Sequence, residues 1–265
     1  PGIAFQRYYN QFIKYVGNVG QDLVETISST IFLVSWKIGW KSQVAEGNDF
    51  APDSFSFWIN HSGFGVNILA SQKNVQGQGA KIVSIGEWAR DVGTYAIYNE
   101  DGLDYEDMAK YMKEHKNLVN YPNGKMITLD DFWELDVDIL IPAALENAIT
   151  AEVAEKINAK LICEAANGPI TPDADVVLER RGIPVSPDIL TNSGGVTVFY
   201  FEWVQNLYGY YWTEKEVVEK QELAMIQAFN YIWKIKEEHD VTMRKATYMH
   251  SVKKIADVMK LRGWY

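Results

Sequence analysis

The sequence is poor in cysteine and has no long apolar segment. Its single cysteine, Cys163, has no partner for an internal disulfide, which is typical of proteins in a reducing cytoplasm. No run of about 18 uncharged apolar residues occurs, so we expect no membrane span. The first residues, Pro1 to Ala4, lack the basic and then apolar pattern of a signal peptide. These absences predict a cytoplasmic protein with no membrane partner, in which Cys163 is a buried, inert thiol.

Positive charge and recognisable motifs for other chemistries are also scarce. Lys and Arg number 25 against 35 Asp and Glu, giving a net charge of −10, and nucleic-acid partners need a positive surface. The four His and one Cys show no spacing of a metal site. No Gly-x-Ser-x-Gly elbow and no phosphate loop ending in Gly-Lys-Ser/Thr is present. We therefore expect no nucleic acid, no metal and none of the activities that those two motifs define.

From about residue 79 the sequence alternates between short apolar runs and helix-forming runs. The apolar runs are of the kind buried in a parallel sheet, and a Thr-Pro pair at 171–172 is typical of a helix start. This rhythm predicts an α/β fold: a Rossmann-like, doubly wound and mostly parallel sheet. The predicted strands are 81–85, 138–142, 161–165 and 184–186, and the predicted helices are 105–114, 151–159 and one that begins at 172.

The two ends of the chain differ from this middle part. Thr213 to Glu216 is a capping box that predicts a helix to about residue 238, and 242–259 is predicted as a last helix. Runs at 12–16 and 30–34 have strand-like composition, whereas 39–55 is polar and could be a linker. We therefore divide the chain into an atypical segment of uncertain fold, 1–57, and a dinucleotide-binding domain with C-terminal helices, 58–265.

Small residues and an asparagine follow three of the predicted strands. They are Ala143, Ala144 and Asn147 after the first, Asn167 after the second and Asn192 after the third. Ligands of doubly wound sheets bind at the carboxyl ends of the strands, and an amide both donates and accepts hydrogen bonds. Asparagines also form turns without any ligand. Their recurrence at three exits favours a ligand site.

Glu87 follows the second strand of the predicted domain. A carboxylate at that position accepts hydrogen bonds from the adenosine ribose of NAD and repels the additional phosphate of NADP. The alternative is a solvent-exposed acid at a strand end.

A glycine turn for the pyrophosphate should lie about 20 residues before this acid. Gly63, Phe64, Gly65, Val66 and Asn67 have that spacing, although Ile68 stands where the third glycine is expected. A second glycine-rich run, 17–20, lacks the first glycine of the pattern and no acid ends the strand that follows it. We favour 63–67 because of its spacing before Glu87. The position of a turn in the fold, and not its exact sequence, determines whether it reaches the pyrophosphate.

Four segments resemble the glutamate dehydrogenase family, which also includes leucine, phenylalanine and valine dehydrogenases. They are 138–147 (DILIPAALEN), 163–169 (CEAANGP), 187–196 (PDILTNSGGV) and 201–206 (FEWVQN), and the closing 259–265 resembles bacterial NAD-specific members. The resemblance runs from about residue 79 to 265. It implies an NAD-dependent enzyme, usually a hexamer, that converts L-glutamate to 2-oxoglutarate and ammonia.

The resemblance also implies roles for single residues. Glu87 would bind the adenosine ribose, Ala143, Ala144, Asn147 and Asn167 would line the cofactor cleft, and Asn192 would approach the nicotinamide. Val196 would border the substrate side chain. Phe199 stands where the family has a serine that holds the distal carboxylate of glutamate, so a dehydrogenase for an apolar amino acid is an alternative.

The catalytic stretches of the family, Gly-Gly-Gly-Lys-Gly-Gly and Pro-Asp-Val-Asn-Thr, do not occur. A lysine that polarises the carbonyl and an acid that moves protons are needed for the reaction. The catalytic residues are therefore unknown, and we expect a fragment, an altered chain or a degenerate homologue. A non-catalytic binding or assembly module is the remaining alternative.

Overall fold

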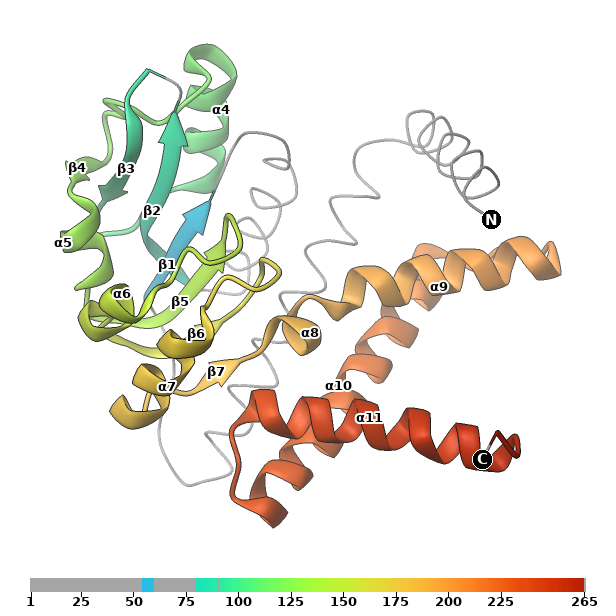
Figure 1. Ribbon diagram of the computed structural model, residues 1–265. Helices are drawn as coiled ribbons and strands as arrows, with labels where there is room; N and C mark the ends of the chain where they lie inside the picture. The colour runs from blue at the N-terminus through green and yellow to red at the C-terminus, as the bar shows by residue number, and fades with distance from the viewer. Residues whose placement is uncertain (1–53, 60–79, 90, 265) are drawn as a thin grey trace.

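A seven-stranded sheet forms the centre of the protein. The computed structural model describes residues 54–59, 80–89 and 91–264, and the strand order within these residues is β4-β3-β2-β1-β5-β6-β7 (Figure 1). The strands are β1 (Ser54–Ile59), β2 (Lys81–Ala89), β3 (Gly93–Tyr98), β4 (Lys125–Ile127), β5 (Val137–Ala143), β6 (Ala159–Cys163) and β7 (Val185–Ser186).

The sheet reverses its winding between β1 and β5. Strand β1 pairs in parallel with β2 on one side and with β5 on the other, and β6 and β7 continue the parallel half. Strands β3 and β4 add an antiparallel edge beyond β2. The predicted doubly wound, mostly parallel sheet is therefore confirmed, and its topological switch point lies between β1 and β5.

Helices cover both faces of the sheet, because β5 carries apolar side chains on both faces. Ile139 and Ile141 of β5 pack in one cluster with Met108 and Met112 of α4, and Leu140 packs in another. That second cluster holds side chains of α5, α6 and α7. These four helices are α4 (Tyr105–His115), α5 (Leu129–Trp133), α6 (Ala151–Lys156) and α7 (Pro172–Arg181).

The C-terminal part consists of four helices, of which the sequence predicted the last two. They are α8 (Asp188–Thr191), α9 (Ser193–Tyr208), α10 (Glu214–His239) and α11 (Met243–Leu261), and α11 packs beside α10 (Figure 1). The predicted capping box is present, since the hydroxyl of Thr213 accepts from the amide of Glu216 and the carboxylate accepts in return. A separate core joins α8, α10 and α11 through Leu190, Met225, Phe229, Ile232, Met243 and Ala246.

The start of the sheet differs from the sequence-based expectation. Ser54 and Phe55, which the polar composition of 39–55 placed in a linker, belong to β1 at the centre of the sheet. The predicted boundary at residue 58 falls within this strand, and the division into two regions stays a prediction. The strands predicted at 12–16 and 30–34 lie outside the described residues.

Within residues 54–59, 80–89 and 91–264, no helix combines the length and the apolar composition that a membrane span requires.

Candidate cofactor-binding site

The switch point brings two predicted strand exits to one place. Ala143, the last residue of β5, is in register with Ile59, the last residue of β1. Ligands of doubly wound sheets bind in the crevice outside these carboxyl ends. Ala143 and Ala144 are half-buried there, and their small side chains allow a ligand to approach the backbone. The predicted glycine turn, 63–67, follows β1 in the sequence but lies outside the described residues.

Backbone hydrogen bonds tie the exit of β6 to the exit of β5. The amides of Ala165 and Ala166 both donate to the carbonyl oxygen of Pro142, at 3.0 and 2.9 Å. The amide of Asn147 donates to the carbonyl oxygen of Gly168 at 2.8 Å. Asn147 and Gly168 have left-handed backbones, with φ of 56° and 54°, and this conformation favours asparagine and glycine. The two loops therefore form one connected wall.

Asn167 and Asn192 meet at this wall. The side-chain nitrogen of Asn192 donates to the side-chain oxygen of Asn167 at 2.7 Å and to the carbonyl oxygen of Ala165 at 3.3 Å. Asn147 and Asn167 are exposed, whereas Asn192 is half-buried between α8 and α9. Three asparagines, each predicted from the end of a different strand, thus lie on adjoining loops.

Glu87 lies on β2 and is buried, with 1% of its surface exposed. Its carboxylate accepts a hydrogen bond from the hydroxyl of Tyr95, the residue directly opposite on β3. That hydroxyl also accepts from the amide of Leu118 at 2.8 Å. Burial, and then the charge of Glu87, raises the pKa of Tyr95 well above its usual value. The alternative of a solvent-exposed acid is wrong, because the side chain is enclosed. The predicted position after the strand is also wrong, because β2 continues to Ala89 and Glu87 lies within it.

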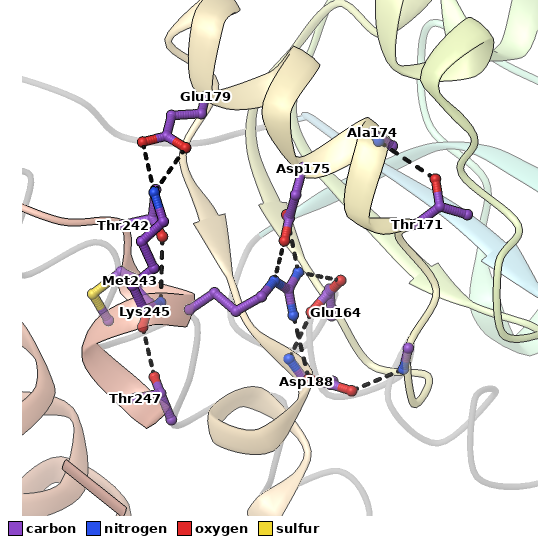
Figure 2. A network of polar contacts seen from close by, with 12 residues as sticks. Glu164, Thr171, Ala174, Asp175, Glu179, Asp188, Thr242, Met243, Lys245 and Thr247 are labelled. Atoms are coloured by element: carbon purple, nitrogen blue, oxygen red, sulfur yellow. Dashed lines mark hydrogen bonds and ion pairs between the residues drawn. The ribbon is translucent and has the colours of Figure 1, made fainter. Parts of the chain in front are cut away.

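An arginine from the C-terminal helices contacts acidic side chains next to these loops, and the sequence did not predict it. Arg244 of α11 donates to the carboxylate of Glu164 at 2.8 Å and to that of Asp175, and it lies 3.5 Å from Asp188. Figure 2 shows Glu164, Asp175 and Asp188 gathered around one guanidinium. Glu164 is fully buried directly after β6, within the CEAANGP segment. That buried acid next to a strand exit was the available signal, but nothing in the sequence indicated its partner.

Ionisation of this cluster follows from burial and pairing. Burial lowers the pKa of Arg244, but the hydrogen bonds with Glu164 and Asp175 outweigh it, so the pKa lies above its usual value and the guanidinium stays charged. Burial raises the pKa of Glu164, and hydrogen bonds from Arg244 and from the amide of Asp188 partly offset that rise. The cluster is therefore a fixed cation that faces three acidic side chains.

The two predicted substrate residues lie on α9 and are largely exposed. Val196 is 64% and Phe199 is 58% exposed, and their spacing places them on one side of the helix. Tyr200, Trp203 and Leu207 are exposed at matching positions. We refer to these five residues as the α9 apolar face. In this chain Phe199 therefore does not lie in an enclosed pocket.

Other places among the described residues show no comparable arrangement. No three His, Cys, Asp or Glu side chains within 54–59, 80–89 and 91–264 could hold a metal ion. An open hollow of about 480 Å³ is lined by residues from Tyr98 to Glu100 and from Pro122 to Lys125. Because β3 is antiparallel to β2, this hollow lies at the opposite edge of the sheet from the strand exits. The strand exits are the candidate site.

The fold is that of a Rossmann-type, doubly wound domain with additional C-terminal helices. Residues 58–263 match the sequence profile of the family described as Glutamate/Leucine/Phenylalanine/Valine dehydrogenase. The chain belongs to this family.

Known relatives agree with this assignment. The chain is 65% identical over 192 residues to the NAD-specific glutamate dehydrogenase of Clostridioides difficile, covering 72% of this chain and 46% of that protein. It is similar to the crystal structure of glutamate dehydrogenase from Peptoniphilus asaccharolyticus, with a TM-score of 0.72, 44% identity and coverage of 90% and 54%. A hetero-hexameric glutamate dehydrogenase from Thermus thermophilus, 22% identical over the same shares, has the same fold with a TM-score of 0.77. The chain spans about half the length of the curated relatives it matches.

Proposed function

We propose that this chain is the NAD-binding part of a glutamate dehydrogenase. The complete enzyme would convert L-glutamate and NAD reversibly to 2-oxoglutarate, ammonia and NADH. One observation carries the proposal: the exits of β5 and β6 and the junction of α8 with α9 are hydrogen-bonded into one wall beside the switch point. The name of the Clostridioides difficile relative, an NAD-specific glutamate dehydrogenase, supports the choice of cofactor and substrate.

The residues of the wall fit a dinucleotide. Ala143 and Ala144 leave room for it, and the exposed amides of Asn147 and Asn167 offer donors and acceptors to ribose hydroxyls. Asn192 would approach the nicotinamide, and the turn Gly63, Phe64, Gly65, Val66 and Asn67 would meet the pyrophosphate. When bound, NAD supplies the acceptor for a hydride.

Glu87 would lie at the adenosine end of this cleft. It belongs to β2, on the other side of β1 from the asparagines, so the cofactor would extend across the carboxyl ends of β2, β1, β5 and β6. Its hydrogen bond from Tyr95 would orient the carboxylate. An acid there accepts from the ribose diol and repels the phosphate of NADP.

Catalysis needs groups that this chain does not contain. The lysine and aspartate stretches of the family are absent from the sequence, so the reacting carbonyl and the transferred proton have no partner here. We expect turnover only when the other half of the enzyme is supplied. The α9 apolar face would then adjoin the substrate, with Val196 and Phe199 nearest to it.

Two further functions have support from specific observations. Phe199 replaces a hydrogen-bond donor with a phenyl ring on an apolar surface, which favours a dehydrogenase for an apolar amino acid. The absence of catalytic groups favours a non-catalytic binding or assembly module. A substrate panel separates them: leucine or phenylalanine turnover supports the first, and no turnover with any amino acid, even beside a complete partner chain, supports the second.

Assembly and location belong to the same proposal. We propose a homo-oligomer, a hexamer by resemblance to the family, with exposed aromatic side chains of α9 at a contact between parts of the assembly. We propose a cytoplasmic location, since a single buried cysteine is typical of proteins in reducing compartments.

Titration of the chain with NADH, followed by the fluorescence of the bound cofactor, tests the proposal directly. We expect saturable enhancement at micromolar NADH and weaker binding of NADPH. Asn192→Ala should weaken NADH binding about tenfold, the loss of one hydrogen bond to the cofactor, while Asn230→Ala on the exposed side of α10 should not change it. No saturable signal with either cofactor would remove the proposed function.

A further inference from the structure

Arg244 lies where the C-terminal helices meet the loop that carries Asn167. Its side chain is 19% exposed, and its guanidinium contacts Glu164, Asp175 and Asp188, which come from three different parts of the chain. We propose that Arg244 is a positioning residue: it fixes the Asn167–Gly168 loop and thereby the nicotinamide end of the cofactor site. This inference rests on the proposed function.

Three hydrogen bonds in series connect the guanidinium to the loop through Glu164 and Asp188. Glu164 accepts from Arg244 through Oε1 and from the amide of Asp188 through Oε2, at 2.8 and 2.7 Å. Asp188 in turn accepts from the amide of Gly168 at 2.8 Å through Oδ2, while its Oδ1 faces Arg244 at 3.5 Å. The position of Gly168 is therefore set by a carboxylate that Arg244 holds.

Gly168 controls the direction of its neighbour Asn167. Gly168 has a left-handed backbone with φ of 54°, and its carbonyl oxygen accepts from the amide of Asn147. If Asp188 no longer accepted from the amide of Gly168, the loop would lose its anchor on the side of α8. The contact between Asn167 and Asn192 would then lose its fixed geometry.

Electrostatics makes the cation necessary for this arrangement. Glu164 is fully buried and Asp188 has 14% of its side chain exposed, and both carboxylates point at the same place. Without a cation, like charges in a low dielectric repel each other, so one carboxylate must take up a proton or turn away. Either change alters the acceptor that Asp188 presents to Gly168.

A merely structural role would be to fasten α11 to the sheet domain. The next residue, Lys245, already does this, because its ammonium lies 3.3 Å from Glu179 of α7. Figure 2 shows Lys245 and Glu179 beside the cluster of Glu164, Asp175 and Asp188. Lys245→Met is therefore a matched control, since it removes a link from α11 to α7 and leaves the cluster intact.

The experiment compares two ligands on the isolated chain. NADH occupies the whole proposed cleft, whereas ADP occupies only its adenosine end, on the side of Glu87. We expect Arg244→Met to weaken the binding of NADH about tenfold and to change the affinity for ADP by less than about twofold. Lys245→Met should change neither affinity. Thermal unfolding of each variant shows whether it is folded at the temperature of the titration.

A conservative variant keeps the inference testable if Arg244→Met does not fold. Arg244→Lys retains the charge but cannot contact two carboxylates with a planar fork. We expect it to weaken the binding of NADH about threefold and to leave the affinity for ADP unchanged. Unchanged NADH affinity in the folded Arg244 variants overturns the inference, as does an equal loss of NADH and ADP or an equal effect of Lys245→Met. If the unaltered chain binds neither ligand, the proposed function itself fails.

Discussion

Tyr95 donates a hydrogen bond to the carboxylate of Glu87, and the two residues are directly paired across β2 and β3. The tyrosine hydroxyl is itself held by the amide of Leu118. An acid at the carboxyl end of the second strand is thus enclosed in a hydrogen-bonded network, and its orientation is set before any ligand arrives.

Glu87→Ser should relax the discrimination against NADP. Removal of the carboxylate removes the repulsion of the additional phosphate, so we expect the ratio of NADH to NADPH affinity to fall about tenfold. Both affinities are measured by titration of the isolated chain. Asp91→Ser, at an exposed position between β2 and β3, is the control, since it removes a nearby acid and keeps Glu87, and its ratio should stay close to that of the unaltered chain. An unmoved ratio in Glu87→Ser would remove this residue from the ribose site.

Phe199→Ser should improve glutamate binding once the missing half of the enzyme is supplied. A hydroxyl can donate to the distal carboxylate of glutamate, whereas a phenyl ring cannot and also occupies space. We expect the KM for glutamate to fall about tenfold, with a smaller change in kcat. Trp203→Ser, one turn further along the α9 apolar face, is the matched control. Equal effects of the two substitutions would show that Phe199 has no special place beside the substrate.

Cys163 should react very slowly with thiol reagents. The side chain is buried, and burial, together with the charge of Glu164, raises its pKa to about 12. Only the thiolate reacts, so we expect modification by iodoacetamide at pH 8 to be at least about a hundredfold slower in the folded chain than in urea. Mass spectrometry of timed samples measures this ratio. Rapid labelling without urea would show that the end of β6 opens readily.

Asp107 should contribute to the loss of stability in acid. Hydrogen bonds from Tyr121 and from Asn123, the latter at 2.6 Å, hold the pKa of Asp107 below its usual value. The folded chain therefore favours the charged form, and the stabilisation is present above the unfolded pKa, about 4, and is lost as pH falls through the folded value.

We expect Asp107→Asn to lower the melting temperature at pH 7 and to weaken its dependence on pH between about 5 and 2. The comparison is made by thermal unfolding across that range. Asp91→Asn, at an exposed position, should leave the pH profile as it is. A variant of Asp107 with the profile of the unaltered chain would contradict this assignment.

The parts that the sequence predicted well are local in the chain. β5 was found because Asp138 to Pro142 is a nearly continuous apolar run, and α7 and α10 because Thr171 and Thr213 are caps. The asparagines were found because they follow such runs. Their roles toward a cofactor remain predictions.

The parts that it missed depend on distant partners. Arg244 is separated from Asp175 by 69 residues and from Glu164 by 80, so only the packing of α11 brings them together. The sequence SFSFWI of β1 alternates between serine and aromatic residues, a pattern typical of a half-buried strand, yet it occupies the centre of the sheet. Hydrophobic periodicity alone could not give this position.

The sheet ends on both sides in very short strands. β4 has three residues and β7 has two, so neither margin offers enough unpaired backbone to extend into a sheet of another molecule. Within the part of the chain that the structure describes, the edges of the sheet thus favour contacts between side chains over strand pairing when copies associate.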